Sequence, residues 1–91
     1  MLILVMPQIS FFLGIVIRMY YRDHNPPHFH AVYAEHEGLI DINKAELISG
    51  SLPARVLGLV IEWTALHQKE LNDNWDRAKK QEPLKAIAPL V

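Results

Sequence analysis

Residues 28–43 read HFHAVYAEHEGLIDIN, and this stretch decides the fold. Its first part, residues 28–34, carries aromatic and β-branched side chains, which favour a strand. Its last part, residues 38–43, alternates in polarity and places Ile40 and Ile42 on one face, as a half-buried strand does. The residues between them suit a tight turn and are too few for a helical crossover. The two strands are therefore predicted to pair antiparallel.

More strands are predicted on both sides of this hairpin. Residues 14–21, GIVIRMYY, are β-branched and aromatic, and residues 8–12 precede them as a further short strand, with Gly14 at the bend. Residues 46–50, ELISG, form a last short strand after a tight turn. The sequence thus predicts an antiparallel meander of four to five strands within residues 8–50.

The spacing of apolar residues changes after residue 50. Residues 51–71 place apolar side chains three or four positions apart, among them Val56, Val60 and Trp63, and this spacing indicates an amphipathic helix. A long helix packed on one face of the sheet would bury that apolar stripe.

The end of the chain allows two interpretations. Residues 72–81 either extend this helix or begin another after a break at residues 72–74. Two prolines favour an extended tail over residues 82–91. We expect helical structure over residues 51–81. The predicted fold class is α+β, an antiparallel β-meander followed by a long C-terminal amphipathic helix packed on one sheet face.

Length and composition predict one globular domain over residues 1–91. The chain has 91 residues, of which 51% are hydrophobic and 21% charged. Its formal net charge of −1 argues against nucleic-acid binding through a strongly basic surface, although a local basic patch stays open. The absence of cysteine excludes disulfides and thiolate zinc sites, and fits a cytoplasmic protein.

The first residues, MLILVMPQIS, form only a short apolar run. A membrane span takes about 20 apolar residues, so we expect no membrane association. Residues 1–5 are predicted to be an N-terminal extension before a start at Met6. The alternative is that they lengthen the first strand.

Residues 23–30, DHNPPHFH, concentrate side chains that can bind a metal or move a proton. Three of the five histidines lie here, with one aspartate and two prolines. His28 and His30 are two positions apart in a predicted strand, so they point to the same face. Asp23 and His24 approach from the other side of a loop that the prolines stiffen. The candidate metal ligands are Asp23, His24, His28 and His30.

Four interpretations of this segment are open from the residues alone. In the first, its side chains hold a divalent ion such as Zn²⁺ or Mn²⁺, and water completes the shell. In the second, His28 and His30 act as acid and base without a metal, with Asp23 beside them. In the third, the segment is a polar surface that recognises a protein or a nucleic acid. In the fourth, these side chains only satisfy the backbone of a turn.

The chain resembles a family of small bacterial proteins, domain-of-unknown-function family 4160. The resemblance rests on MPQIS, on GIVIRMYYRDHNPPHFHAVYAEHEGLIDI and on the run from EW to NW, and DHNPPHFH is its most specific part. The family usually has a glycine where this chain has Lys44 and Ala45, so this hairpin is expected to be less tight or differently bulged. The family signature carries over to Asp23, His24, Asn25, Pro26, Pro27, His28, His30, Glu62, Trp63, His67 and Trp75.

The resemblance implies no particular reaction, and its one functional clue is the kind of gene found beside members of the family. Genes of this family often lie beside those of a small protein that looks like a helix-turn-helix regulator, which implies a toxin–antitoxin-like pair. We therefore expect a small cytoplasmic interaction protein that binds a partner protein. Self-association through an exposed edge strand is also expected to be feasible.

An enzyme is the competing hypothesis. The chain would then hydrolyse phosphodiester bonds, with RNA as the substrate. His28 and His30 would hold a metal or act as base and acid. Asp23 would orient a histidine or complete the metal shell.

Overall fold

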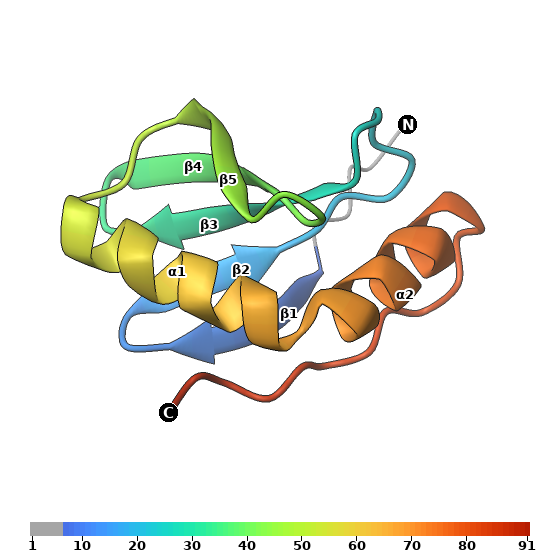
Figure 1. Ribbon diagram of the computed structural model, residues 1–91. Coiled ribbons are helices and arrows are strands. Elements are labelled where there is room, and N and C mark those ends of the chain that lie inside the picture. Colours follow the sequence, from blue (N-terminus) through green and yellow to red (C-terminus); the bar gives the residue numbers. More distant parts are fainter. Residues whose placement is uncertain (1–6) are drawn as a thin grey trace.

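The structure is a computed structural model that describes residues 7–91. It contains one antiparallel sheet with the strand order β1-β2-β3-β4-β5, followed by two helices (Figure 1). The elements are β1 (Gln8–Phe12), β2 (Ile15–Arg18), β3 (His28–Tyr33), β4 (His36–Asp41), β5 (Glu46–Gly50), α1 (Ala54–Leu66) and α2 (Gln68–Lys79). The predicted α+β class and the antiparallel meander are confirmed. The predicted extension at residues 1–5 lies outside the described residues.

The helical region is two helices rather than the one long helix that was predicted over residues 51–81. The chain leaves helical geometry at His67, where φ is −124° and ψ is 25°. The side chain of Gln68 then donates a hydrogen bond to the carbonyl of Ile42 at 2.9 Å, which ties the start of α2 to the end of β4. No helix within residues 7–91 is long and apolar enough to cross a membrane.

The alternative break at residues 72–74 is also wrong, because Asn74 lies inside α2 and is fully buried. Its side chain donates a hydrogen bond to the carbonyl of Lys85 at 2.9 Å and accepts one from the same residue's N–H at 2.8 Å. An asparagine that reads as a helix breaker in the sequence therefore anchors the segment after α2.

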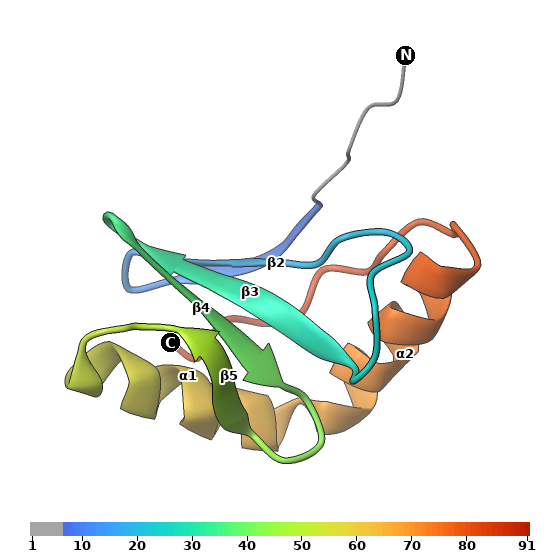
Figure 2. The same ribbon diagram turned by 90° about the horizontal axis from the view of Figure 1, so that it is seen from above.

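Helix α1 and the sheet share one hydrophobic core. The Trp63 ring is fully buried, with its centroid 5.4 Å from that of Phe12 and 5.7 Å from that of Phe29. Helix α1 lies along one face of the sheet, and α2 continues past the ends of the strands beside the start of β3 (Figure 2). Because side chains alternate along a strand, His28 and His30 project from β3 on the side opposite to Phe29.

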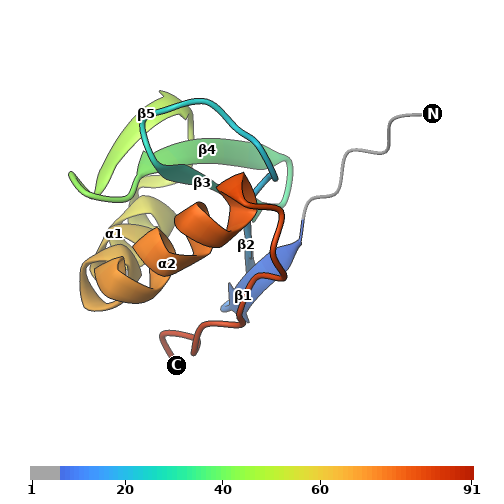
Figure 3. The same ribbon diagram turned by 90° about the vertical axis from the view of Figure 1, so that its right-hand side faces the viewer.

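The segment after α2 has no regular structure but is held by hydrogen bonds. The N–H of Ile87 donates to the carbonyl of Ile9 at 2.8 Å, and Ser10 Oγ donates to the carbonyl of Ile87 at 2.9 Å. Trp63 Nε1 donates to the carbonyl of Ala88 at 2.9 Å. This segment runs beside β1 (Figure 3). One edge of the sheet is thus partly covered, whereas β5 forms the other edge and is mostly exposed.

The β4–β5 hairpin, for which the family resemblance predicts a less tight or differently bulged turn, is irregular. Asp41 Oδ1 accepts hydrogen bonds from the N–H groups of Asn43 and Lys44, each at 2.9 Å. Ala45 follows with φ at 51°, in the left-handed region that disfavours a side chain. The register of the strand pair also shifts once within β4.

Candidate metal centre

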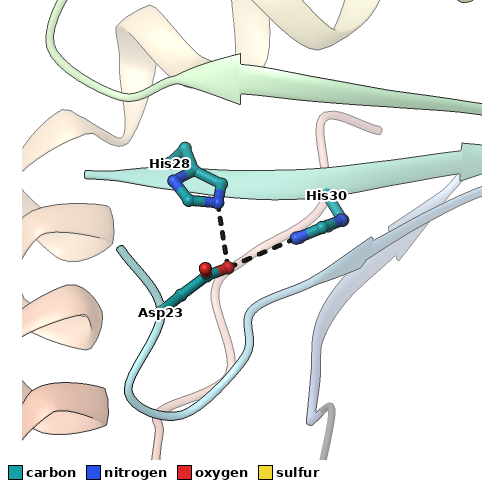
Figure 4. A group of neighbouring side chains, drawn as sticks. All are labelled: Asp23, His28 and His30. Atoms are coloured by element: carbon teal, nitrogen blue, oxygen red, sulfur yellow. Dashed lines mark hydrogen bonds and ion pairs between the residues drawn. The ribbon is translucent and has the colours of Figure 1, made fainter. Parts of the chain in front are cut away.

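Three side chains of the predicted site meet beside β3 (Figure 4). His28 and His30 come from β3, and their ring centroids are 5.5 Å apart. Asp23 comes from the loop between β2 and β3. Each residue offers one ligand atom, and these atoms all lie within 4.8 Å of one another. Both histidines are buried and Asp23 is partly buried.

Asp23 uses both carboxylate oxygens. Oδ1 accepts a hydrogen bond from the N–H of His24 at 2.8 Å. Oδ2 lies 2.9 Å from His28 Nε2 and 3.6 Å from His30 Nε2. Burial acts to raise the pKa of Asp23, but the His24 hydrogen bond and the nearby imidazoles of His28 and His30 outweigh it and lower this pKa. The carboxylate is therefore the charged form at neutral pH.

The other ring nitrogen of each histidine faces an acceptor. His28 Nδ1 lies 2.7 Å from the carbonyl oxygen of Pro26, and His30 Nδ1 lies 2.8 Å from Glu37 Oε2. A carbonyl oxygen only accepts, and an ionised carboxylate only accepts, so both Nδ1 atoms carry the proton. In a neutral imidazole Nε2 then presents a lone pair. In that form the lone pairs of both Nε2 atoms would face the ionised Asp23 Oδ2, and only a proton or a cation between the atoms makes such contacts favourable.

His30 Nε2 is the least satisfied atom of this group. It is buried, and it has no hydrogen-bond partner among the described residues. Its separation of 3.6 Å from Asp23 Oδ2 is too long for a hydrogen bond. A buried nitrogen without a partner costs free energy, and native proteins rarely leave one. A proton on His28 would satisfy the His28–Asp23 contact but not His30. A cation between the three atoms would satisfy all of them.

The two separations from Asp23 Oδ2 are close to those found between the ligand atoms of a metal ion. Bonds of about 2.1 Å from a divalent ion to nitrogen and oxygen place adjacent ligand atoms roughly 3.0–3.4 Å apart. The observed separations from Asp23 Oδ2 are 2.9 Å to His28 and 3.6 Å to His30. Metal-binding histidines also commonly donate their second N–H to a backbone carbonyl or a carboxylate, as these two do to Pro26 and Glu37.

His24, the fourth predicted ligand, is not part of this group. It is exposed, and its contact with Asp23 is through its backbone N–H. It lines a pocket of about 600 Å³ that opens beside the group, together with Tyr20, Tyr21 and Arg22. Of the predicted ligands, the structure thus brings together Asp23, His28 and His30.

The contact of His28 with the carbonyl of Pro26 is of the kind that the turn interpretation predicts, whereas the contact with Glu37 was not predicted from the sequence. Strand pairing explains the contact with Glu37. Val32 pairs with Glu37 and His30 pairs with Leu39, so Glu37 and His30 lie on the same face of adjacent strands. The sequence does show an acidic residue close to the hairpin turn, but its contact with His30 can be inferred only once the register of β3 and β4 is known.

The other signature residues lie outside the group. Glu62 is exposed and Trp63 is buried in the core. His67 lies at the break between the helices, and its Nδ1 is 2.6 Å from Glu70 Oε1. Trp75 of α2 is buried, with its ring centroid 5.3 Å from that of His28. The second tryptophan therefore forms a wall beside the candidate metal centre.

Comparisons with known proteins agree with the sequence resemblance. Searches of curated proteins and of solved structures found no significant match. A protein-family model matches residues 14–76, which include Asp23, His28, His30 and Glu37. Because this match covers more than half of the chain, the chain belongs to the family described as Domain of unknown function (DUF4160).

Proposed function

We propose that Asp23, His28 and His30 bind one divalent metal ion, and that the chain is a small metal-dependent hydrolase of phosphodiester bonds, with RNA as its substrate. The observation that carries this proposal is the buried, unpartnered Nε2 of His30, which faces Asp23 Oδ2 while Nδ1 of the same ring is bonded to Glu37. Native proteins pair the large majority of their buried polar side-chain atoms, so an unpaired imidazole nitrogen calls for an explanation.

The donor set narrows the choice of ion. Two imidazoles and one carboxylate suit Zn²⁺, Mn²⁺ and Ni²⁺, and the same set is used by Fe²⁺ enzymes. Three protein ligands leave coordination positions for water and substrate, as catalytic sites do. A bound divalent ion would polarise a phosphoryl oxygen and lower the pKa of a bound water. The pocket beside Asp23 gives a substrate access to this position.

Metal binding is tested first, on protein without a histidine tag and after treatment with a chelator. Calorimetric titration with Zn²⁺, Mn²⁺ and, without oxygen, Fe²⁺ is expected to show one ion per chain for at least one of them. Asp23→Asn and His30→Gln should each abolish the binding. His36→Gln is the matched control, because His36 Nε2 lies 3.5 Å from Glu35 and outside the group.

Hydrolysis is tested next, with bis(4-nitrophenyl) phosphate and a labelled single-stranded RNA. Turnover should require the added ion and should be lost in Asp23→Asn protein that is still folded by circular dichroism. Stoichiometric metal binding without turnover of either compound would contradict the hydrolase, while leaving the metal centre in place.

A second proposal is that the chain binds a partner protein. Exposed apolar side chains support it: Ile48 on the edge strand β5 is 47% exposed, and Phe11 on β1 and Leu13 in the turn after β1 are 54% and 53% exposed. Edge strands and exposed apolar groups favour association. The toxin–antitoxin-like pairing and the cytoplasmic location stay predictions of the family resemblance.

Two measurements separate the proposals. Sedimentation velocity over a range of concentrations tests self-association, which Ile48→Lys should reduce. Expression in bacterial host cells tests toxicity. Growth arrest that needs both His28 and His30 supports a toxic hydrolase, whereas arrest that persists in the His28→Ala/His30→Ala double variant supports action through an interface.

A further inference from the structure

Arg22 lies beside the candidate metal centre in an unusual backbone conformation. It immediately precedes Asp23, and its φ of 58° is in the left-handed region that disfavours side chains. Both residues line the pocket of about 600 Å³, together with Tyr20 and Tyr21. Strained backbone that persists in a loop often marks a functional site. Here the strained residue and a candidate metal ligand are neighbours in the wall of the same pocket.

The charge of Arg22 is not neutralised within residues 7–91. Arg22 is exposed and belongs to none of the ion pairs among these residues. Its contact is with Gln81, just after α2, whose amide oxygen in the satisfied orientation accepts hydrogen bonds from Nε and Nη2. A neutral amide positions the guanidinium without cancelling its charge, so the group remains able to attract an anion.

The local charges also favour an anion. A divalent ion would be balanced by the carboxylates of Asp23 and Glu37, which contact the two histidines. Arg22 then leaves the pocket with a positive charge, even though the whole chain has a formal net charge of −1. The remaining wall of the pocket includes phenol rings and the apolar side chains of Leu39 and Ile48, which suit the organic part of an ester.

We propose that Arg22 binds a phosphoryl group of the substrate through its guanidinium, next to the metal centre. This inference rests on the proposed function, because it places the anion beside the ion held by Asp23, His28 and His30. A guanidinium presents paired N–H donors that match two phosphoryl oxygens, and its charge does not depend on pH in the physiological range. Arg22 would thereby select phosphate esters over neutral esters.

The test uses Mn²⁺-loaded protein and dimethyl phosphate as the probe. Bound Mn²⁺ accelerates the ³¹P relaxation of a phosphate ester that lies near it. Arg22→Gln should lower the affinity for dimethyl phosphate by about tenfold or more, because it removes charge-assisted hydrogen bonds. The Mn²⁺ affinity, measured separately by electron paramagnetic resonance, should stay unchanged. Arg55→Gln, at an exposed position of α1, should match the wild type in both measurements.

A second variant separates binding from folding. Arg22→Gly relieves the left-handed conformation and should raise the thermal midpoint, yet it should lose dimethyl phosphate affinity as Arg22→Gln does. Unchanged affinity in either variant would overturn the inference, and so would equal affinity for acetate and dimethyl phosphate in the wild type. Failure of the wild type to bind Mn²⁺ or any other divalent ion would instead overturn the proposed function, and this inference with it.

Discussion

Nδ1 of His30 lies 2.8 Å from Oε2 of Glu37, on the neighbouring strand β4. This contact fixes the ring so that Nε2 faces Asp23. Replacing Glu37 with glutamine keeps the size but removes the charge, and the amide can turn its N–H₂ towards Nδ1. We expect the metal affinity to fall roughly 10- to 100-fold, as for other partners of ligand histidines.

Glu35→Gln is the control for this change, since Glu35 is an exposed acid of the same hairpin that contacts His36 instead. Calorimetric titration of both variants measures the difference. Equal metal affinities for Glu37→Gln and Glu35→Gln would show that Glu37 does not support the site.

Trp75 should report metal binding. Its ring centroid is 5.3 Å from that of His28, whereas Trp63 lies against Phe12 and Phe29 in the core. A bound paramagnetic ion such as Co²⁺ should therefore quench mainly the fluorescence of Trp75. The Trp75→Phe variant should lose most of the quenching and the Trp63→Phe variant should keep it. Quenching that survives in Trp75→Phe would place the ion elsewhere.

Two glycines should respond to alanine in opposite directions. A Cβ on Gly50, where φ is 77°, would collide with the carbonyl oxygen of Glu37, while a Cβ on Gly58 in α1 would meet no atom within 4 Å. Gly50→Ala should lower the free energy of unfolding by roughly 2–4 kcal/mol, from the combined backbone strain and collision. Gly58→Ala should raise it by about 0.5–1 kcal/mol, because alanine is the better helix former.

Urea denaturation measures both changes. Because the collision involves Glu37, Gly50→Ala should also weaken metal binding, while Gly58→Ala should leave it intact. Similar stabilities for the two variants would contradict the described approach of β5 to β4.

Ala45→Gly should stabilise the β4–β5 hairpin. Ala45 has φ at 51°, which costs an alanine about 1–2 kcal/mol and a glycine little, although glycine loses more entropy on folding. We expect a net gain of about 0.5–1 kcal/mol in the free energy of unfolding. Ala65→Gly, at an exposed position of α1, should instead lose about 1 kcal/mol. A loss of stability in Ala45→Gly would contradict the left-handed conformation.

Local patterns were enough to predict the sheet. The alternation around Ile40 and Ile42 and the short connections define an antiparallel meander without any tertiary knowledge. The helix break was not predictable in the same way, because the apolar spacing continues through His67 and no proline or glycine marks it. The start of α2 is tied by Gln68 to the end of β4, a contact between residues far apart in the sequence.

The candidate metal centre was likewise predicted where local pattern decides and missed where tertiary structure decides. Strand alternation predicts that His28 and His30 share a face, and the loop brings Asp23 close to both. The sequence could not show that His24 lies outside the group of Asp23, His28 and His30, because its position depends on the path of the loop rather than on strand periodicity. Glu37 was missed because its proximity to His30 depends on the register of β3 and β4.

The central claim is that Asp23, His28 and His30 hold one divalent ion. Its most direct test is calorimetric titration of chelator-treated, tag-free protein, comparing the wild type with the His28→Ala/His30→Ala double variant and the His36→Gln control. We predict one ion per chain for the wild type and for His36→Gln, and none for the double variant. No binding of Zn²⁺, Mn²⁺, Ni²⁺ or Fe²⁺ by folded wild-type protein, or equal binding by the folded double variant, would contradict the claim.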